Sequence, residues 1–200
     1  MESKAKILQG ATGLFLKYGV KSVTMDDISR ELGISKKTLY QHVENKADLI
    51  EQTVQLYIDD EKKMIASIRG EAENAIHEMV ILAKYITQMF REMPSGLTYD
   101  LQKYHRKSWD LMESYNQTHI YGVIKDNIER GIEQGVYRND LNPDIIAKLY
   151  VGKTSIIVDE DVFPLRDYNK ENLFKEYIKY HLHGIASAKG LKLLEKHSLI

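Results

Sequence analysis

The chain has 200 residues, of which 43% are hydrophobic and 28% are charged, and its formal net charge is −1. This composition is typical of globular chains and is enough for one large or two modest domains. The sequence contains no cysteine, which excludes disulfide scaffolds, thiol nucleophiles and metal sites built from cysteine. No segment approaches the ~20 apolar residues of a membrane span, and the N-terminus lacks the apolar core of a signal peptide. We therefore expect a cytoplasmic protein without a membrane anchor.

Charge is unevenly divided along the chain. Residues 1–48 hold eight Lys or Arg and six Asp or Glu, a net charge of +2, whereas the remainder carries −3. A mildly basic N-terminal segment indicates a nucleic-acid partner only if its lysines share one face. The positions of these lysines within the predicted helices therefore decide how the charge is interpreted.

Helical periodicity dominates the sequence, and no sustained alternation typical of strands occurs, so we predict an all-α fold. The apolar stripe of the first helix consists of Ile7, Leu8, Ala11, Leu14, Phe15 and Tyr18. Gly19 ends this helix at a C-cap position. A capping box of Thr24 and Asp27 begins a short second helix over about 25–32, which Gly33 closes.

A third short helix follows, with Ser35 as its N-cap. The inward side of the second and third helices is formed by Val23, Ile28, Leu32, Ile34, Leu39 and Val43. This pattern is typical of a helix-turn-helix, in which the second helix lies in the major groove of DNA. The residues of the third helix that point away from the inward side are Lys36, Lys37, Thr38, Tyr40, Gln41 and His42. Their side chains suit phosphates and base edges.

Three lysines occupy first turns of helices, where the helix dipole disfavours a cation by roughly 0.3–1 kcal/mol. Lys36 and Lys37 follow the Ser35 cap, and Lys46 follows Asn45, which together with Asp48 begins a fourth helix. A bound phosphate reverses this cost, because the backbone N–H groups and the ammonium groups then act together. The alternative is a three-helix packing unit whose polar face is merely solvated.

Longer helices are predicted after this segment. Their expected ranges are about 46–69, 72–92, 98–107, 110–133, 143–158 and 170–187. A break is expected at Pro94-Ser95-Gly96, and Asn142 is the expected cap before Pro143. No flexible linker and no internal repeat is present, so the fourth helix joins the N-terminal segment to the rest of the chain.

Taken together, these motifs resemble the N-terminal DNA-binding domain of the TetR family of bacterial transcriptional regulators. The similarity covers about residues 4–50 and rests on A-x-x-L-F-x-x-Y-G, T-x-x-D-I-S-x-x-L-G, S-x-x-T-L-Y-x-H and N-K-x-x-L. Val43 replaces the phenylalanine usual at this position, which we interpret as a difference in core packing. The resemblance implies a helix-turn-helix DNA-binding domain over residues 1–48 and a larger helical dimerisation and effector-binding domain over residues 49–200.

The resemblance also implies roles for single residues. The residues that begin the second and fourth helices, here Thr24 and Lys46, contact phosphates in the family. Tyr40 and His42 are expected at the DNA backbone. The expected base readers are Lys36, Lys37 and Gln41. The complete predicted DNA-binding set is Thr24, Ser35, Lys36, Lys37, Thr38, Tyr40, Gln41, His42 and Lys46.

A two-fold dimer through the helices near 143–158 and 170–187 is a further implication. Two recognition helices must lie about 34 Å apart to reach successive major-groove faces. The candidate interface or core residues are Ile145, Ile146, Leu149, Tyr150, Leu173, Tyr177, Ile178 and Leu182. The predicted effector-binding residues are Tyr85, Met89, Phe90, Tyr104, Trp109, Met112, Tyr115 and His119. Their aromatic and methionine content favours a small apolar or aromatic ligand, and ordinary helix packing is the alternative.

We thus predict a homodimeric regulator that binds double-stranded DNA at a palindromic operator and is released by a small-molecule effector. The resemblance favours repression, and the alternatives within this fold are an activator and a ligand-independent regulator. The alternative from another class is a helical metal protein or enzyme. A di-metal bundle needs paired Glu-x-x-His motifs, whereas Glu73 and His77 have no matching pair. We therefore expect neither catalysis, nor a metal, nor a cofactor.

Overall fold

The computed structural model describes residues 4–94 and 96–197, so Ser95 of the predicted break lies outside the described residues. These residues are mainly helical and contain no β-strand, which confirms the all-α prediction; one antiparallel bridge joins Tyr137 to Ala186. None of the described helices is long and apolar enough to span a membrane. The chain divides into unit 1, Met1–Glu61 with Glu92–Ser114, and unit 2, Lys62–Arg91 with Tyr115–Ile200. A functional boundary between residues 48 and 49 stays a prediction.

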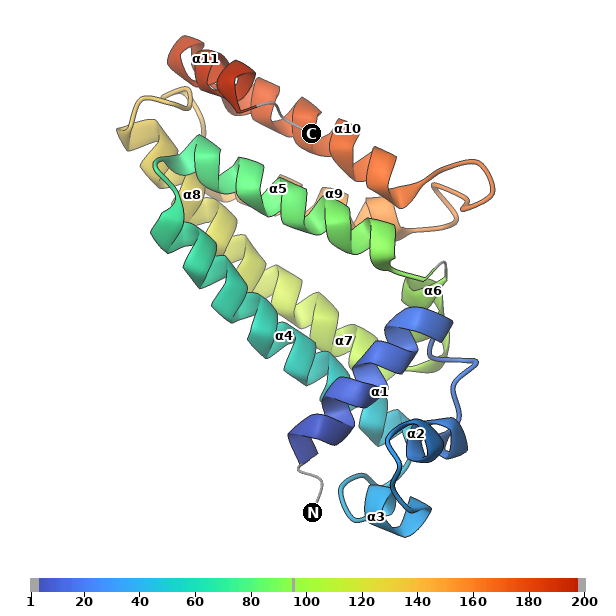
Figure 1. Cartoon of the computed structure of the whole chain (residues 1–200). Coiled ribbons are helices and arrows are strands. Elements are labelled where there is room, and N and C mark those ends of the chain that lie inside the picture. Colours follow the sequence, from blue (N-terminus) through green and yellow to red (C-terminus); the bar gives the residue numbers. More distant parts are fainter. Residues whose placement is uncertain (1–3, 95, 198–200) are drawn as a thin grey trace. The chain divides into compact units, whose positions relative to one another are not determined.

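Unit 1 contains the predicted helix-turn-helix (Figure 1). Its elements are α1 (Lys4–Tyr18), α2 (Met25–Glu31), α3 (Lys36–Tyr40), the first part of α4 (Lys46–Glu71), α6 (Leu97–Tyr104) and nearly all of α7 (Arg106–Tyr115). The α1 stripe is buried except for Tyr18, the last helical residue, whose ring is exposed beside the Lys17 ammonium. Gly19 follows with a φ of 80°, in the left-handed region that ends helices.

The predicted caps are present in unit 1. Thr24 Oγ1 accepts a hydrogen bond from Asp27 N at 3.2 Å, and Asp27 Oδ2 accepts one from Thr24 N at 3.0 Å. The Ser35 hydroxyl accepts from Thr38 N, and the Asn45 side chain accepts from Asp48 N, both at 3.0 Å. These bonds satisfy N–H groups that the helix itself leaves without a partner.

The inward residues of the helix-turn-helix are largely as predicted. Val23, Ile28, Leu39 and Val43 are buried, whereas Leu32 and Ile34 are half-buried. The α3 helix ends at Tyr40, two residues before the predicted end at His42.

Unit 2 contains the remaining helices (Figure 1). They are the second part of α4, α5 (Ala75–Glu92), the π-helical turn η1 (Asn116–Ile120), α8 (Tyr121–Glu133), α9 (Pro143–Val158), α10 (Lys170–Ile185) and α11 (Ala188–Lys196). The bounds of α9 and its Asn142 cap are as predicted. The α5 helix begins three residues later than predicted, because Asn74 caps it by accepting from His77 N.

A predicted break and a predicted continuous helix also differ from the structure. The break expected between residues 107 and 110 lies at His105, whose φ and ψ of −131° and 57° are not helical. The single helix expected over 110–133 contains the π-helical turn η1. A π turn leaves the apolar pattern almost unchanged, so periodicity does not reveal it.

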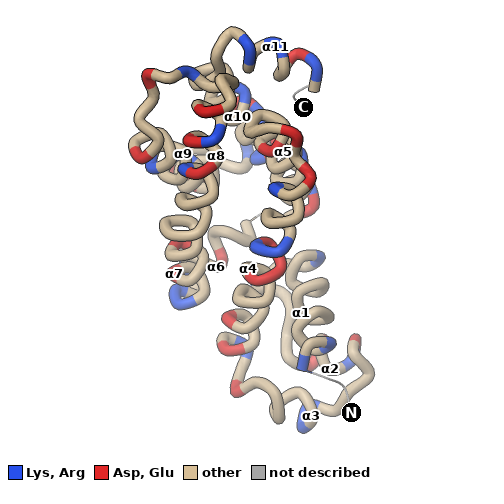
Figure 2. Tube along the Cα trace, turned by 90° about the vertical axis from the view of Figure 1, so that its left-hand side faces the viewer, with Lys and Arg blue, Asp and Glu red and all other residues tan. Residues whose placement is uncertain are grey.

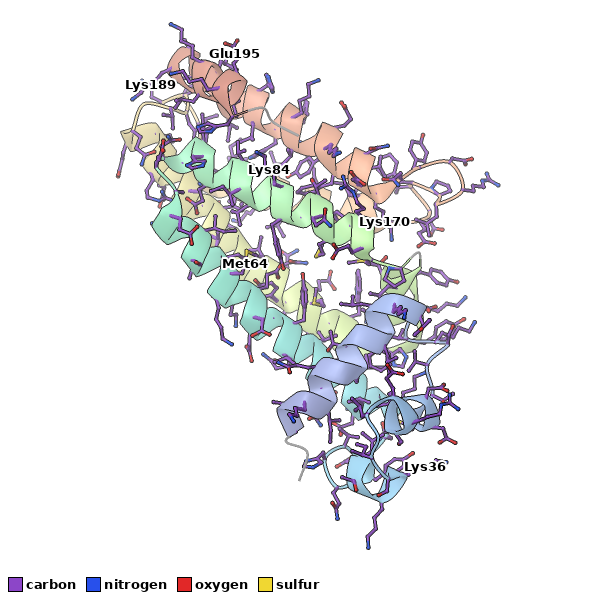
Figure 3. All side chains as sticks on the ribbon, in the orientation of Figure 1. Lys36, Met64, Lys84, Lys170, Lys189 and Glu195 are labelled. Carbon is purple, nitrogen blue, oxygen red and sulfur yellow. The ribbon has the colours of Figure 1, made fainter. Side chains whose placement is uncertain are left out.

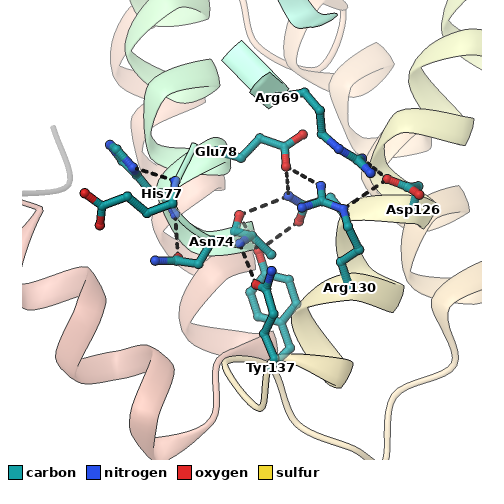
Figure 4. Close-up of polar contacts among 11 residues, drawn as sticks. Arg69, Asn74, His77, Glu78, Asp126, Arg130 and Tyr137 are labelled. Carbon is teal, nitrogen blue, oxygen red and sulfur yellow. Dashed lines mark hydrogen bonds and ion pairs between the residues drawn. The ribbon is translucent and has the colours of Figure 1, made fainter. Parts of the chain in front are cut away.

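A polar network lies in the core of unit 2 (Figure 4). The Glu78 side chain of α5 has no exposed surface and forms an ion pair with Arg130 of α8. Asn127 donates to Glu78 Oε2 at 3.0 Å, and the Tyr137 hydroxyl donates to Asn127 Oδ1 at 2.9 Å. Removal of one partner of a buried ion pair is strongly destabilising, because the other charge is left uncompensated. The network therefore fixes the pairing of α5 with α8.

His181 of α10 is a second buried polar group of unit 2. Its ring lies against those of Tyr150 and Tyr177, with centroids 5.0 and 6.1 Å away. Burial in this aromatic surrounding, together with the charge of Lys153, lowers the pKa of His181 to about 4. The imidazole is consequently neutral in the folded protein at neutral pH.

Acidification should unfold the protein partly through His181. The unfolded imidazole binds a proton near pH 6.5 and the folded one only near pH 4, so stability falls as the pH decreases through this window. The loss should be on the order of 3 kcal/mol in the free energy of unfolding. Urea unfolding at several pH values, for the wild type and His181→Gln, measures this contribution.

The exposed His183 of the same helix provides the matched control. His183→Gln should retain the wild-type pH dependence, whereas His181→Gln should flatten it between pH 4 and 6.5. Parallel curves for the wild type and His181→Gln would contradict the assignment.

Candidate nucleic-acid interface

The predicted DNA-binding residues all belong to unit 1 and lie at the starts of α2 and α4, along α3, and in the two residues that follow α3. The exposed ones are Thr24, Ser35, Lys36, Lys37, Tyr40 and Gln41, and the half-buried ones are Thr38, His42 and Lys46. Within α3, Leu39 has no exposed surface while the next residue, Tyr40, is 49% exposed. Burial of Leu39 thus directs the opposite side of α3 outward. Figure 2 shows basic residues on α3 and near α2.

Lys36 has a partner that the sequence pattern did not reveal. Its Nζ lies 2.6 Å from Asp26 Oδ1 of α2, and this contact raises the pKa of Lys36. The unfavourable position in the first turn of α3 is therefore compensated within the unit. Both side chains are more than half exposed, so the pair contributes little stability, and the ammonium can exchange the carboxylate for a phosphate. Lys36 is labelled in Figure 3 at the α2–α3 end of the unit.

Lys46 is more enclosed than the other two lysines. Its Nζ donates to the carbonyl of Lys21, in the turn between α1 and α2, at 3.4 Å. Burial lowers the pKa of Lys46, and the carboxylates of Asp100 and Asp27 oppose this effect. Lys21 and Asp100 were both missed by sequence reasoning, because their proximity to Lys46 arises only from the tertiary structure.

Two hydroxyl groups of the predicted set are already used by the helix caps. Thr24 Oγ1 lies 2.6 Å from Asp27 Oδ2, and Ser35 Oγ lies 2.9 Å from Thr38 Oγ1. The Thr24 bonds, followed by the charge of Arg30, lower the pKa of the Asp27 carboxyl group, which stays ionised. Thr24 and Ser35 therefore hold the helix starts in place. By contrast, Lys37 and Gln41 are exposed and one helical turn apart.

The predicted effector-binding residues fall into both units. Unit 1 holds Tyr104, Trp109 and Met112, and unit 2 holds Tyr85, Met89, Phe90, Tyr115 and His119. Their grouping as one site stays a prediction.

Within unit 2, the π turn brings the rings of Tyr115 and His119 together, with centroids 5.4 Å apart. Phe90 packs against Phe174 in the core. Burial, with a smaller effect of the Lys62 charge, lowers the pKa of His119. π-helical turns are frequent at functional sites.

In unit 1, Tyr104 is 52% exposed, and its ring lies beside the ammonium groups of Lys21 and Lys103. Among residues 4–94 and 96–197, no group of three His, Asp or Glu side chains has the arrangement of a metal site.

The chain is similar to known bacterial regulators. Residues 7–53 match the family model described as bacterial regulatory proteins of the tetR family. The uncharacterised HTH-type transcriptional regulator YvaF of Bacillus subtilis is 27% identical over 146 residues, which cover 72% of this chain and 75% of YvaF. The HTH-type transcriptional repressor KstR2 of Mycolicibacterium smegmatis is 22% identical over 191 residues, 94% of this chain and 92% of KstR2.

A solved structure of similar fold is a transcriptional regulator from Saccharomonospora viridis in complex with choline. It superposes with a TM-score of 0.71 at 20% identity and covers 92% of this chain and 97% of that one. At this identity the likeness shows the fold.

Substitutions of Ser35 should separate its role as a helix cap from the effect of surface charge on DNA binding. Ser35→Asn and Ser35→Asp both preserve an N-cap acceptor, so both should retain the free energy of unfolding within about 0.5 kcal/mol. Only Ser35→Asp adds a negative charge where a phosphate would lie. We expect Ser35→Asp to weaken binding to duplex DNA at least tenfold, and Ser35→Asn to bind as the wild type does. Fluorescence anisotropy with labelled duplexes measures both, and equal affinities of the two variants would contradict the interface.

Proposed function

We propose that this chain, which belongs to the TetR family of bacterial regulatory proteins, represses transcription by binding a palindromic operator as a homodimer. The main evidence for this proposal is the exposed polar side of α3, which burial of Leu39 directs outward. The start of α3 in this helix-turn-helix is capped. Such a helix enters the major groove. The named repressor among the relatives favours repression. Operator DNA as the partner implies action in the cytoplasm.

The proposed roles of the individual residues follow from the exposure of their side chains. Lys37 of α3 and Gln41, the residue that follows the helix, are exposed, and they can read guanine and adenine edges in the major groove. Lys36 and Lys46 already have protein partners and supply charge to phosphates. The remaining predicted residues, Thr24, Ser35, Thr38, Tyr40 and His42, complete the contact to the DNA backbone.

An exposed apolar face on unit 2 supports the homodimer. Ile145, Leu149 and Ile156 of α9 are each about half exposed, at 53%, 50% and 47%, and Tyr180 of α10 is 67% exposed. Together with Gly152, the three α9 residues form a single stripe along the helix. Among the described residues, no atom apart from the chain neighbours of Gly152 and the backbone of its own helix lies within 4 Å of a Cβ built there, so a second helix can approach closely.

The other candidate residues of these helices belong to the core of the chain itself. Tyr150, Tyr177, Ile178 and Leu182 are buried, and Ile146 and Leu173 are partly buried against the same core. This division leaves Ile145 and Leu149 as the proposed interface residues of the predicted set. A contiguous apolar face of this kind is typical of a protein–protein interface.

We further propose that a small apolar or aromatic molecule weakens operator binding. A regulator of the same fold has choline bound, which supports an effector role for this fold. At the π turn, the half-buried His119 ring stacks on the buried Tyr115 ring, so His119 is the proposed contact for such a ligand in unit 2. The ligand acts by a difference in affinity between DNA-bound and free states.

Selection of duplexes from a random pool tests the proposed function directly. The wild type should enrich a palindrome whose half-sites lie about one helical turn apart. Gln41→Ala and Lys37→Ala should each relax the preference at particular base pairs, with a loss of about 1–3 kcal/mol for the preferred base. Absence of any enriched sequence with the folded wild type would exclude the proposal.

The dimer is tested by a charge placed on the exposed stripe. Leu149→Glu should convert the protein to a monomer and reduce operator affinity by at least tenfold, because the buried charge would lack a partner. Leu191→Glu, at an exposed position on α11, makes the same chemical change outside the stripe and should remain dimeric. Analytical ultracentrifugation measures the molar mass. A dimeric Leu149→Glu variant would place the interface elsewhere.

A further inference from the structure

Tyr104, the last residue of α6, lies beside the turn that connects α1 to α2 in unit 1. The Lys21 ammonium lies 5.4 Å from the centroid of the Tyr104 ring, which is within the range of a cation–π contact. Lys21 belongs to the turn between α1 and α2, three residues before the Thr24 cap. The same ring also lies 5.6 Å from the Lys103 ammonium, which belongs to α6 itself. Of these two cation–π contacts, the one with Lys21 joins α6 to the turn.

The turn that carries Lys21 also holds Lys46. The Lys46 ammonium donates to the Lys21 carbonyl, so the two lysines lie next to each other beside the start of α2. Val20 and Val23, on both sides of Lys21, are buried and fix the backbone of the turn. Asp100 of α6 attracts the Lys46 charge. The α6 helix thus contacts Lys21 through the Tyr104 ring, and its Asp100 carboxylate opposes the lowering of the Lys46 pKa by burial.

We propose that α6 competes with DNA phosphates for Lys21 and Lys46, through the Tyr104 ring and the Asp100 carboxylate. This proposal rests on the proposed function and adds Lys21 to the residues that contact the DNA backbone. The clasped state, in which α6 holds both lysines, binds DNA less tightly than the released state. An effector that favours the clasped state lowers operator affinity, because a ligand shifts the equilibrium toward the state it binds better. Tyr104 therefore acts on Lys21 and not on the effector in this proposal.

Double-mutant cycles on operator affinity test the competition. The operator is the duplex selected by the wild type, and fluorescence anisotropy is measured at several salt concentrations. Tyr104→Leu should bind about two- to fivefold more tightly than the wild type, the change expected for loss of an exposed cation–π contact. In the Lys21→Met background, Tyr104→Leu should change nothing. Lys21→Met alone should weaken binding and reduce the salt dependence by about one phosphate contact.

A second cycle examines Asp100 in the same way. Asp100→Asn should tighten binding in the wild type but not in the Lys46→Ala background. A general effect of removing a negative charge would persist in both backgrounds. Asp110→Asn removes a carboxylate that is paired with Arg106 on α7, and it should leave affinity unchanged.

Two further variants separate the ring contact from a structural effect. Tyr104→Phe keeps the aromatic face and should behave as the wild type. Tyr99→Leu removes an exposed tyrosine whose ring lies beside Lys103 within α6, and it should also leave affinity unchanged. Tyr104→Leu should fold normally because its side chain is half exposed.

The outcomes distinguish this inference from the proposed function. If the wild type selects an operator, and Tyr104→Leu binds it equally well or gains equally in the Lys21→Met background, the competition is excluded while the proposed function stands. If the folded wild type selects no duplex, both are excluded. A gain that disappears in the Lys21→Met background and is absent from Tyr104→Phe supports the competition.

Discussion

Burial of Leu39 is the interaction on which the proposed DNA-binding surface depends. The α3 helix has only five residues, far fewer than the ~12–15 that give an isolated helix marginal stability in water. It persists because Leu39 is fully buried, which contributes about 1.5–3 kcal/mol, and because the Ser35 side chain caps its start. With Leu39 fixed inward, the direction of every other α3 side chain follows from helix geometry. The orientation of Lys37 and Gln41 is thus a consequence of core packing.

Much of unit 1 could be predicted because its signals are local. Thr24 with Asp27, Ser35 with Thr38, and Asn45 with Asp48 each interact within three residues along the chain, so the sequence itself contains both partners. The environment of the lysines could not be predicted. Lys36 meets Asp26 and Lys46 meets the Lys21 carbonyl only after the helices have packed, and periodicity carries no information on such pairs.

In unit 2, periodicity likewise does not distinguish buried apolar residues from exposed ones. Leu149 and Tyr150 are adjacent apolar residues of α9, yet Leu149 is half exposed and Tyr150 is buried beside His181. An apolar residue that faces a partner chain and one that faces the core of its own chain have the same sequence signature. The exposed fraction of each side chain in the folded protein distinguishes these two kinds of residue. The π turn at Asn116–Ile120 was not predicted for a related reason. A local change from α-helical to π-helical hydrogen bonding leaves the pattern of hydrophobic residues almost unchanged.

The Lys36–Asp26 pair bears on how the salt dependence of DNA binding is interpreted. A lysine that neutralises a phosphate releases a condensed cation from the DNA. In the proposed complex, Lys36 would leave Asp26 for a phosphate, and the freed carboxylate would remain close to the DNA. Its repulsion of the phosphates would offset part of the attraction that Lys36 provides. Lys36 would therefore contribute less to operator affinity, and to the dependence of that affinity on salt, than a lysine without an acidic neighbour.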